Sequence, residues 1–166
     1  PVPETENLGG RYRARKNADG TFDIYDVPIV SELQKGERRD LPQFEITEDW
    51  LKAALGRAQE RLATDYMAPL HIRHHAPDYT APRAGFVVPR RLGDFTLEGK
   101  ATATIFADLV RVQRDVAMKI SRGELPYCSV EILNTKGTPE IDSLALLDSE
   151  PPHAAKGERR QQGDRG

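Results

Sequence analysis

Residues 127–132 read Tyr127-Cys128-Ser129-Val130-Glu131-Ile132. Because side chains alternate across a β-strand, every second residue of this stretch points to the same face. The face that carries Cys128, Val130 and Ile132 is apolar and is predicted to pack against the core. Ser129 lies on the other face, which is predicted to point towards solvent or a cleft.

Strands and helices are predicted on both sides of this stretch. The strand extends over residues 127–133, and a second strand at 140–147 follows a turn. Residues 107–122 carry apolar side chains at helical spacing, with Gly123 after the end, which predicts an amphipathic helix. Residues 95–105 alternate apolar or small residues with threonine and charged residues, which predicts a half-buried strand.

The N-terminal half is predicted to add a hairpin, a helix and two short strands. Residues 12–16 and 21–29 flank a turn-rich tetrad and predict the hairpin. Apolar residues recur every three or four positions over residues 47–64, which predicts a helix with Thr47 as its N-cap. The two short strands are predicted at residues 69–75 and 84–89.

These elements predict an α+β chain with a mainly antiparallel sheet, forming a small β-barrel, and two principal helices. With 166 residues, the chain is about one domain long. The predicted domain covers residues 11–149. Residues 1–10 are expected to form a flexible N-terminal segment, and the polar residues 150–166 a disordered C-terminal tail.

The composition argues against several classes of protein. Lys and Arg number 24 and Asp and Glu 26, so the formal charge is −2, without the basic excess of a general nucleic-acid binder. No apolar run approaches the roughly 20 residues that cross a bilayer, and the N-terminus lacks the pattern of a secretory signal. The single cysteine, Cys128, leaves no internal disulfide, which fits a reducing, cytosolic setting.

Ser129 and Cys128 are the two candidate nucleophiles of the strand. Adjacent strand residues point to opposite faces, so one histidine cannot serve both. A thiol on the apolar face is more typical of a small buried hydrophobe than of a reactive group. Alternation therefore favours Ser129 over Cys128. Taken alone, a serine on a polar strand face is usually a surface residue.

Three of the four histidines lie in the run His71-Ile72-Arg73-His74-His75. On a strand, His74 shares a face with its apolar neighbours, whereas His71 and His75 point the other way. A zinc site built from these three histidines, joined by Asp78 or His153, is an alternative, because zinc takes three or four such ligands. Against it, strand alternation divides the three histidines between two faces. The spacing also suits a histidine-rich polar loop.

Several motifs follow one another along the chain. In order they are Pro69-Leu70 before the histidine run, Ala84-Gly85-Phe86-Val87, Gly123-Glu124-Leu125-Pro126-Tyr127-Cys128-Ser129-Val130-Glu131-Ile132, Leu144-Ala145-Leu146-Leu147, and Pro151-Pro152. This ordered set resembles the prohead proteases of tailed phages, particularly the Mu-like branch, which are related to herpesvirus assemblins. The resemblance spans residues 22–152 and implies a serine endopeptidase.

The resemblance also implies roles for individual residues. Ser129 falls on the family nucleophile, and the base falls on His74 or His75, with His74 preferred for its distance from the Pro-Leu pair. The third member of the family's triad, a second histidine or an acid, aligns with Ser143, which cannot serve in the same way. The residues near enough in sequence to replace it are Asp142, the first choice because it lies within the strand, Asp148, Glu140 and His153.

In the implied mechanism, the imidazole takes the Ser129 proton as the hydroxyl attacks a peptide carbonyl, and later protonates the leaving amine. Arg73, Arg90 and Arg91 are candidates for stabilising the oxyanion. The implied substrates are scaffold and capsid-protein extensions, and the protease itself, cut inside the phage prohead in the host cytoplasm.

Capsid and scaffold proteins are the partners that the resemblance implies. The sequence does not decide whether the chain forms a homo-oligomer. No membrane, nucleic acid, cofactor or metal is expected. Two other functions also stay open: a catalytically inert capsid-assembly or scaffold module of the same fold, and a metal-dependent hydrolase built on His71, His74 and His75.

Overall fold

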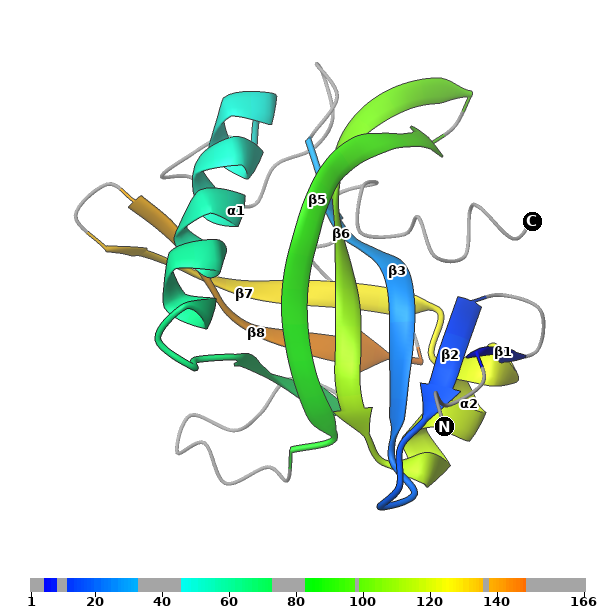
Figure 1. Cartoon of the computed structure of the whole chain (residues 1–166). Helices are drawn as coiled ribbons and strands as arrows, with labels where there is room; N and C mark the ends of the chain where they lie inside the picture. Colours follow the sequence, from blue (N-terminus) through cyan, green and yellow to red (C-terminus); the bar gives the residue numbers. More distant parts are fainter. Residues whose placement is uncertain are drawn as a thin grey trace.

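The computed structural model describes residues 5–8, 12–32, 46–72, 83–97, 99–135 and 138–148. In chain order its elements are β1 (Thr5–Leu8), β2 (Tyr12–Lys16), β3 (Phe22–Ser31), α1 (Glu48–Leu62), β4 (Ala68–Ile72), β5 (Gly85–Leu97), β6 (Lys100–Val112), α2 (Arg114–Ser121), β7 (Tyr127–Thr135) and β8 (Thr138–Leu147). Two helices accompany one sheet (Figure 1), which confirms the predicted α+β class. In the described part of the chain, neither helix is long and apolar enough to cross a membrane.

The eight strands belong to one sheet, in the order β1-β2-β3-β6-β5-β4-β8-β7. Six strand pairs are antiparallel and one, β4 with β8, is parallel, so the mainly antiparallel sheet is confirmed. Strands β7 and β8 cross behind β5 and β6 (Figure 1), and Cys128 Sγ lies 4.0 Å from the carbonyl oxygen of Pro28 in β3. Among the described strands, β1 and β7 are the two edges of the sheet, each paired on one side only. The sheet is therefore curled but not closed, and the predicted barrel is not shown.

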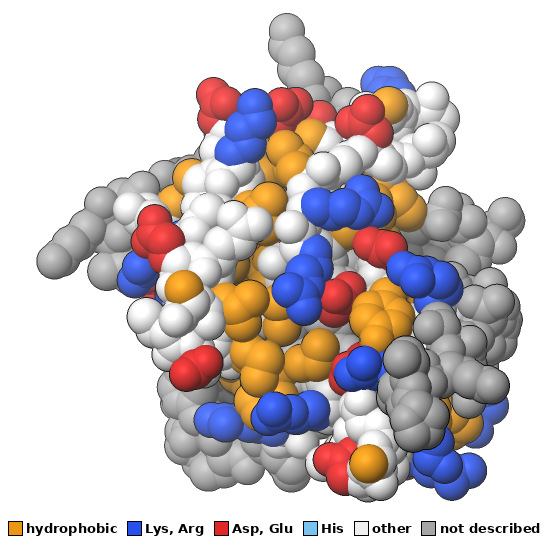
Figure 2. All heavy atoms as spheres, viewed as in Figure 1, with side chains coloured by type: hydrophobic (Ala, Val, Ile, Leu, Met, Phe, Trp, Pro, Cys, Tyr) orange, Lys and Arg blue, Asp and Glu red, His pale blue; other side chains and the backbone are white. Residues whose placement is uncertain are grey.

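Helix α1 confirms its predicted start. Glu48 is its first residue, and Thr47 caps it because its hydroxyl oxygen accepts a hydrogen bond from the Trp50 N–H at 3.1 Å. The helix packs on β5, β6 and β8 and buries Leu51 and Ala54. Apolar side chains gather between α1 and β5 on the face shown in Figure 2. Burial of this stripe, more than helix propensity, holds a helix of this length in place.

Residues 95–105 are two strands, so the prediction of one continuous strand is wrong. Strand β5 ends at Leu97, which pairs with Lys100 across a tight turn, and Gly99 has the positive φ of 79° that such turns favour. The turn changes which residues share a face, so Thr102 and Thr104 are fully buried instead of forming a polar surface. Local alternation looks the same on both arms of a tight hairpin, which is why the pattern read as one strand.

The second predicted helix is also shorter than expected. Only Arg114–Ser121 is helical, whereas residues 107–112 belong to β6. These residues pair with β3 on one side and β5 on the other, and that pairing satisfies their backbone groups without a helix. The helical spacing of Val116, Ala117 and Ile120 is the part of the pattern that does form a helix, and all three are buried.

Candidate functional site

Strand register brings Ser129 and His71 to the same face of the sheet. Ala145 of β8 pairs with Ser129 of β7 on one side and with His71 of β4 on the other. Residues directly opposite one another point to the same face, so these three residues form a row, termed the Ser129 row. Neighbouring strands lie about 4.8 Å apart, which separates the Cα atoms of His71 and Ser129 by roughly 10 Å. The side chain between them is only the methyl group of Ala145.

The Ser129 row is buried even though it points away from the main core. The exposed fraction is 5% for His71, 1% for Ala145 and 8% for Ser129. Ala145 also packs with Tyr127 and Leu147 in a small cluster of its own. The predicted face of Ser129 is right, but its predicted exposure is wrong, because both faces of β7 are covered at this position. The hydrogen bonds between described residues do not include one between Ser129 and His71.

Cys128 lies on the opposite face, as alternation predicts. It is fully buried within the main core, where it packs as a small apolar side chain. A thiol in this position is shielded from a peptide on the Ser129 face by the sheet itself. The structure therefore supports the choice of Ser129 over Cys128 as the candidate nucleophile.

Next to the Ser129 row lies a buried hydroxyl, that of Ser143. Ser143 pairs with Glu131, is 1% exposed, and its Oγ has no hydrogen-bond partner among the described residues. A buried hydroxyl normally finds a partner, because leaving one unsatisfied costs free energy. Ser143 is the position that the resemblance assigned to the third member of a triad.

Asp142 reaches this side of the sheet through a β-bulge. The register between β7 and β8 shifts so that Glu131 pairs with Ser143 while the next residue of β7 pairs with Ile141, which leaves Asp142 as the extra residue. Asp142 lines a groove together with Pro69, which lies two residues before His71 on the same face of β4. Asp142 thus lies on the same side of the sheet as His71, as does Glu131 of β7.

The other acids predicted for the site lie elsewhere. Asp148 is exposed and follows the last residue of β8, three positions beyond Ala145. Glu140 accepts hydrogen bonds from Arg57 Nε at 2.6 Å and from Arg61 Nη1 at 3.2 Å, both from α1. The hydrogen bond to Glu140 raises the pKa of Arg57 above its ordinary value. Glu140 is therefore part of the contact between α1 and β8, away from the Ser129 row.

The two described candidates for the oxyanion site are occupied by ion pairs. Arg90 Nε lies 2.9 Å from Asp108 Oδ2, and Arg91 Nε lies 3.3 Å from Asp26 Oδ1. Outside the described residues lie His74, His75, Arg73, Asp78 and His153. Among the described residues, no group of three or more His, Cys, Asp or Glu side chains could hold a metal ion.

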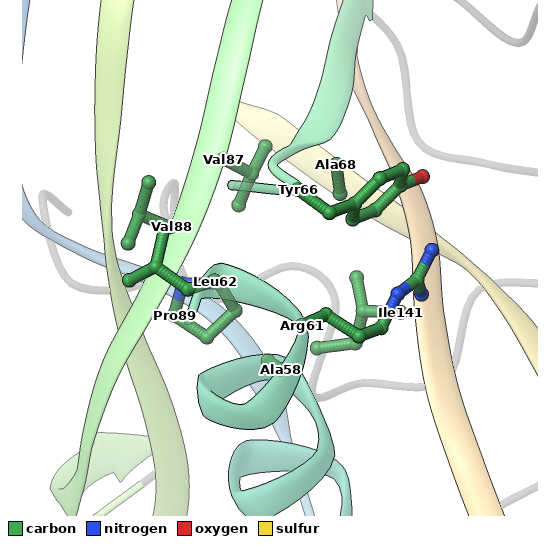
Figure 3. Close-up of a pocket in the computed structure, with 9 residues that line it drawn as sticks. All are labelled: Ala58, Arg61, Leu62, Tyr66, Ala68, Val87, Val88, Pro89 and Ile141. Carbon is green, nitrogen blue, oxygen red and sulfur yellow. The ribbon is translucent and has the colours of Figure 1, made fainter. Parts of the chain in front are cut away.

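A small pocket under α1 is too small to be the site. Its volume is about 20 Å³, which is on the scale of a single water molecule, and its lining is mostly apolar. Figure 3 shows Arg61 beside Tyr66 at one end of this pocket, and the guanidinium carbon lies 3.8 Å from the centroid of the Tyr66 ring. The pocket belongs to the packing between α1 and the sheet.

A groove that the sequence did not indicate begins at Asp142 and crosses the same side of the sheet. It consists of two adjoining hollows of about 470 Å³ each, which share Met67 and Arg111. The groove, termed the Arg111 groove, has Pro69 and Phe86 in its first hollow and the turn before β3 in its second. No periodic signal marks it, because its residues come from strands that only the tertiary fold brings together.

Comparison of this chain with protein-family models, with curated protein sequences and with solved structures finds no match. Membership of the phage prohead-protease family therefore stays a prediction from the sequence motifs. The function is inferred from those motifs and from the geometry of this chain.

Proposed function

We propose that this chain is a serine endopeptidase with Ser129 as nucleophile and a histidine of the run at residues 71–75 as general base. The observation that carries the proposal is the Ser129 row, in which a hydroxyl and an imidazole share a buried face with one methyl group between them. The sequence favours His74, and the described geometry favours His71. Both lie within the run that the sequence singles out.

The chemistry follows from these groups. The imidazole takes the proton of Ser129 Oγ as the oxygen bonds to a peptide carbonyl carbon, and then protonates the amine as the C–N bond breaks. The imidazole then takes a proton from a water molecule that attacks the ester carbonyl carbon, and returns a proton to Ser129 Oγ as the C–O bond breaks. Asp142 is the best-supported acid for orienting the histidine, because it lines the groove that contains Pro69. Since Ser129 is 8% exposed, this face must open for a peptide to reach the hydroxyl.

Resemblance to phage prohead proteases supports a narrower version of the proposal. In that version, the substrates are scaffold and capsid-protein extensions, including segments of the protease itself. The partners are capsid and scaffold proteins, and the reaction takes place inside the prohead in the host cytoplasm.

A catalytically inert assembly module of the same fold is the second candidate. It is favoured by Ser143, which stands where the resemblance expects the third member of a triad. The burial of Ser129 without a hydrogen bond to His71 among the described residues favours it as well. The two candidates differ in whether the Ser129 hydroxyl reacts.

The test combines active-site labelling with substitution of each candidate. A serine-directed phosphonate should label the full chain at Ser129, and Ser129→Ala should lower the cleavage of a capsid-precursor protein by at least about 10³-fold. Cys128→Ala is the matched control, since it removes the neighbouring nucleophile on the opposite face, and it should retain activity. If the Ser129→Ala variant still cleaves the precursor, the protease proposal is wrong. If the wild-type chain is neither labelled nor active, the inert module is supported.

The base is identified in the same assay by His71→Gln, His74→Gln and His75→Gln, made one at a time. Loss of the general base should lower kcat by about 10²–10⁴-fold, while the other two variants stay close to wild type. A loss confined to His71→Gln would assign the base to the Ser129 row. A loss confined to His74→Gln or His75→Gln would remove His71 from the mechanism.

A further inference from the structure

Arg111 stands on an unusual piece of backbone at the centre of the Arg111 groove. Its φ is 52°, a left-handed conformation that residues other than glycine rarely adopt. The pairing of β3 with β6 contains an extra residue on β6 at this point, which makes a β-bulge. Asp23 of β3 stabilises the bulge, because its Oδ1 accepts a hydrogen bond from the Arg111 N–H at 3.0 Å.

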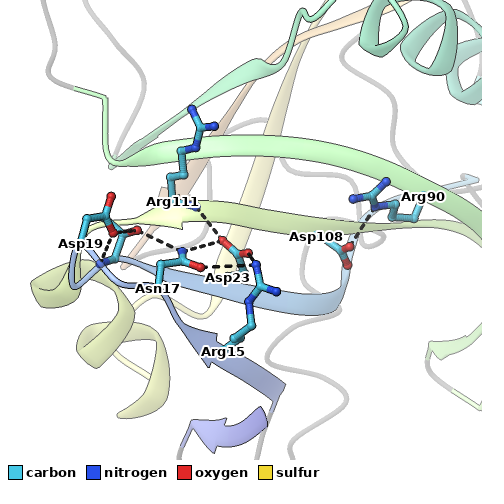
Figure 4. A network of polar contacts seen from close by, with 8 residues as sticks. Arg15, Asn17, Asp19, Asp23, Arg90, Asp108 and Arg111 are labelled. Carbon is cyan, nitrogen blue, oxygen red and sulfur yellow. Dashed lines mark hydrogen bonds and ion pairs between the residues drawn. The ribbon is translucent and has the colours of Figure 1, made fainter. Parts of the chain in front are cut away.

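The carboxylate of Asp23 is already neutralised by other groups. It accepts hydrogen bonds from Arg15 Nη2 at 3.0 Å and from Asn17 Nδ2 at 3.0 Å. Figure 4 shows the side chain of Arg111 projecting away from this network while its backbone faces Asp23. Among the described residues, the Arg111 guanidinium makes no hydrogen bond or ion pair. The fold thus holds an exposed cation in the groove, while the Asp23 carboxylate is bound to the backbone N–H of Arg111.

The remaining charges of the groove leave Arg111 available to a ligand. Asp19 accepts two hydrogen bonds from Thr21, and these lower the pKa of Asp19 more than the charge of Arg111 does. Arg83 lines the same hollow as Pro69 and Phe86, so a second cation flanks the apolar part of the groove. Asp65 and Asp142 also line this hollow, so the groove favours a ligand with both apolar and charged parts over a simple anion.

We infer that the Arg111 groove binds an extended peptide and that Arg111 pairs with one Asp or Glu side chain of it. This inference rests on the proposed protease function, because the peptide is the substrate that continues to Ser129. From β6, the strand of Arg111, to β7, the strand of Ser129, the sheet order runs through β5, β4 and β8. Four strand spacings of about 4.8 Å give roughly 19 Å, and an extended chain covers about 3.3 Å per residue. Allowing for the reach of the guanidinium, the acidic residue lies about five residues from the cleaved bond.

The test measures how many residues separate an acidic side chain from the cleaved bond. A mixture of synthetic 16-residue peptides is incubated with the full chain, and the new termini are sequenced by mass spectrometry. Asp and Glu should be enriched about fivefold at a position near five residues from the cut, on one side of it. Arg111→Gln should abolish the enrichment, and Arg111→Lys should retain part of it. Raising the salt concentration should weaken the preference in the wild-type chain, because the ion pair is exposed.

Arg114→Gln is the matched control, because it removes the same charge from an exposed position outside the groove. It should leave the acidic preference unchanged. Cleavage without any acidic preference, or a preference that survives Arg111→Gln, overturns the role of Arg111 and leaves the protease proposal standing.

A second arm separates the groove from the catalysis. If the wild-type chain cuts no peptide, the same peptides are passed over the immobilised full chain carrying Ser129→Ala. Acidic peptides should be retained about fivefold more than their Gln counterparts, and adding Arg111→Gln should remove the difference. Retention without cleavage would support the groove while the protease proposal fails. Equal retention of acidic and neutral peptides would overturn the groove as well.

Discussion

The two faces of strands β4, β8 and β7 are equally well buried but carry different chemistry. On the core face, Leu144 and Leu146 are at most 1% exposed, and on the opposite face His71, Ser129 and Ser143 are at most 8% exposed. A buried leucine stabilises the fold by roughly 1.5–3 kcal/mol when it leaves water. A buried hydroxyl or imidazole has a free-energy cost unless it is hydrogen-bonded. The stability of the sheet accounts for the first face, and the proposed catalytic role would account for the polar residues of the second.

The largest effect is expected on the core face. Leu144→Ala should lower the free energy of unfolding by about 2–5 kcal/mol, because it leaves a cavity in a packed core. Urea denaturation of the full chain measures the change. Leu133→Ala is the control, since Leu133 of β7 is 47% exposed and its truncation should cost less than about 0.5 kcal/mol. Similar losses for both variants would mean that the core face is not closely packed.

An intermediate effect is expected in the middle of the Ser129 row. Ala145→Leu inserts three carbon atoms between His71 and Ser129, which should cost about 1–3 kcal/mol through overpacking and abolish any cleavage. Ala101→Leu is the control, because Ala101 is exposed on β6. An Ala145→Leu variant with full stability and full activity would show that the imidazole does not pass over this methyl group.

The smallest effect, and of opposite sign, is expected at Ser143. Ser143→Ala removes a buried hydroxyl that has no partner in the described part of the chain, so the free energy of unfolding should stay level or rise by up to about 1 kcal/mol. The control is Ser31→Ala, because the equally buried Ser31 hydroxyl lies 2.7 Å from that of Thr104, and its removal loses a buried hydrogen bond, at about 0.5–1.5 kcal/mol. A loss at Ser143 as large as at Ser31 would reveal a partner for its hydroxyl.

Much of the secondary structure was predictable because its signals are local. The N-cap at Thr47, the apolar spacing of α1 and the strands at β7 and β8 each depend on residues close in sequence, and all three are confirmed. The two errors have different causes. The start of α2 at Arg114 depends on the pairing of β6 with β3, which lies far earlier in the chain. The turn at Gly99 is local, but it was missed because side-chain alternation looks the same on both arms of a hairpin.

The features of the candidate site likewise differ in whether they depend on local or on long-range signals. Alternation was enough to place Ser129 and Cys128 on opposite faces, because it depends only on the geometry of one strand. The choice of histidine depended on the register between β4 and β8, which is a contact between residues more than 70 positions apart. The Arg111 groove also escaped prediction, since its walls come from separate strands and one bulge.

By itself, the sequence determined the α+β class, the strand that carries Ser129 and the side of that strand on which the hydroxyl lies. Local propensity and the two-residue period of a strand are sufficient for these features. Only the tertiary structure decided that His71 shares a row with Ser129, that this face is buried, and that Arg111 projects into a groove on the same side. These features depend on strand register and on the curl of the sheet, which arise from pairing and packing between distant segments.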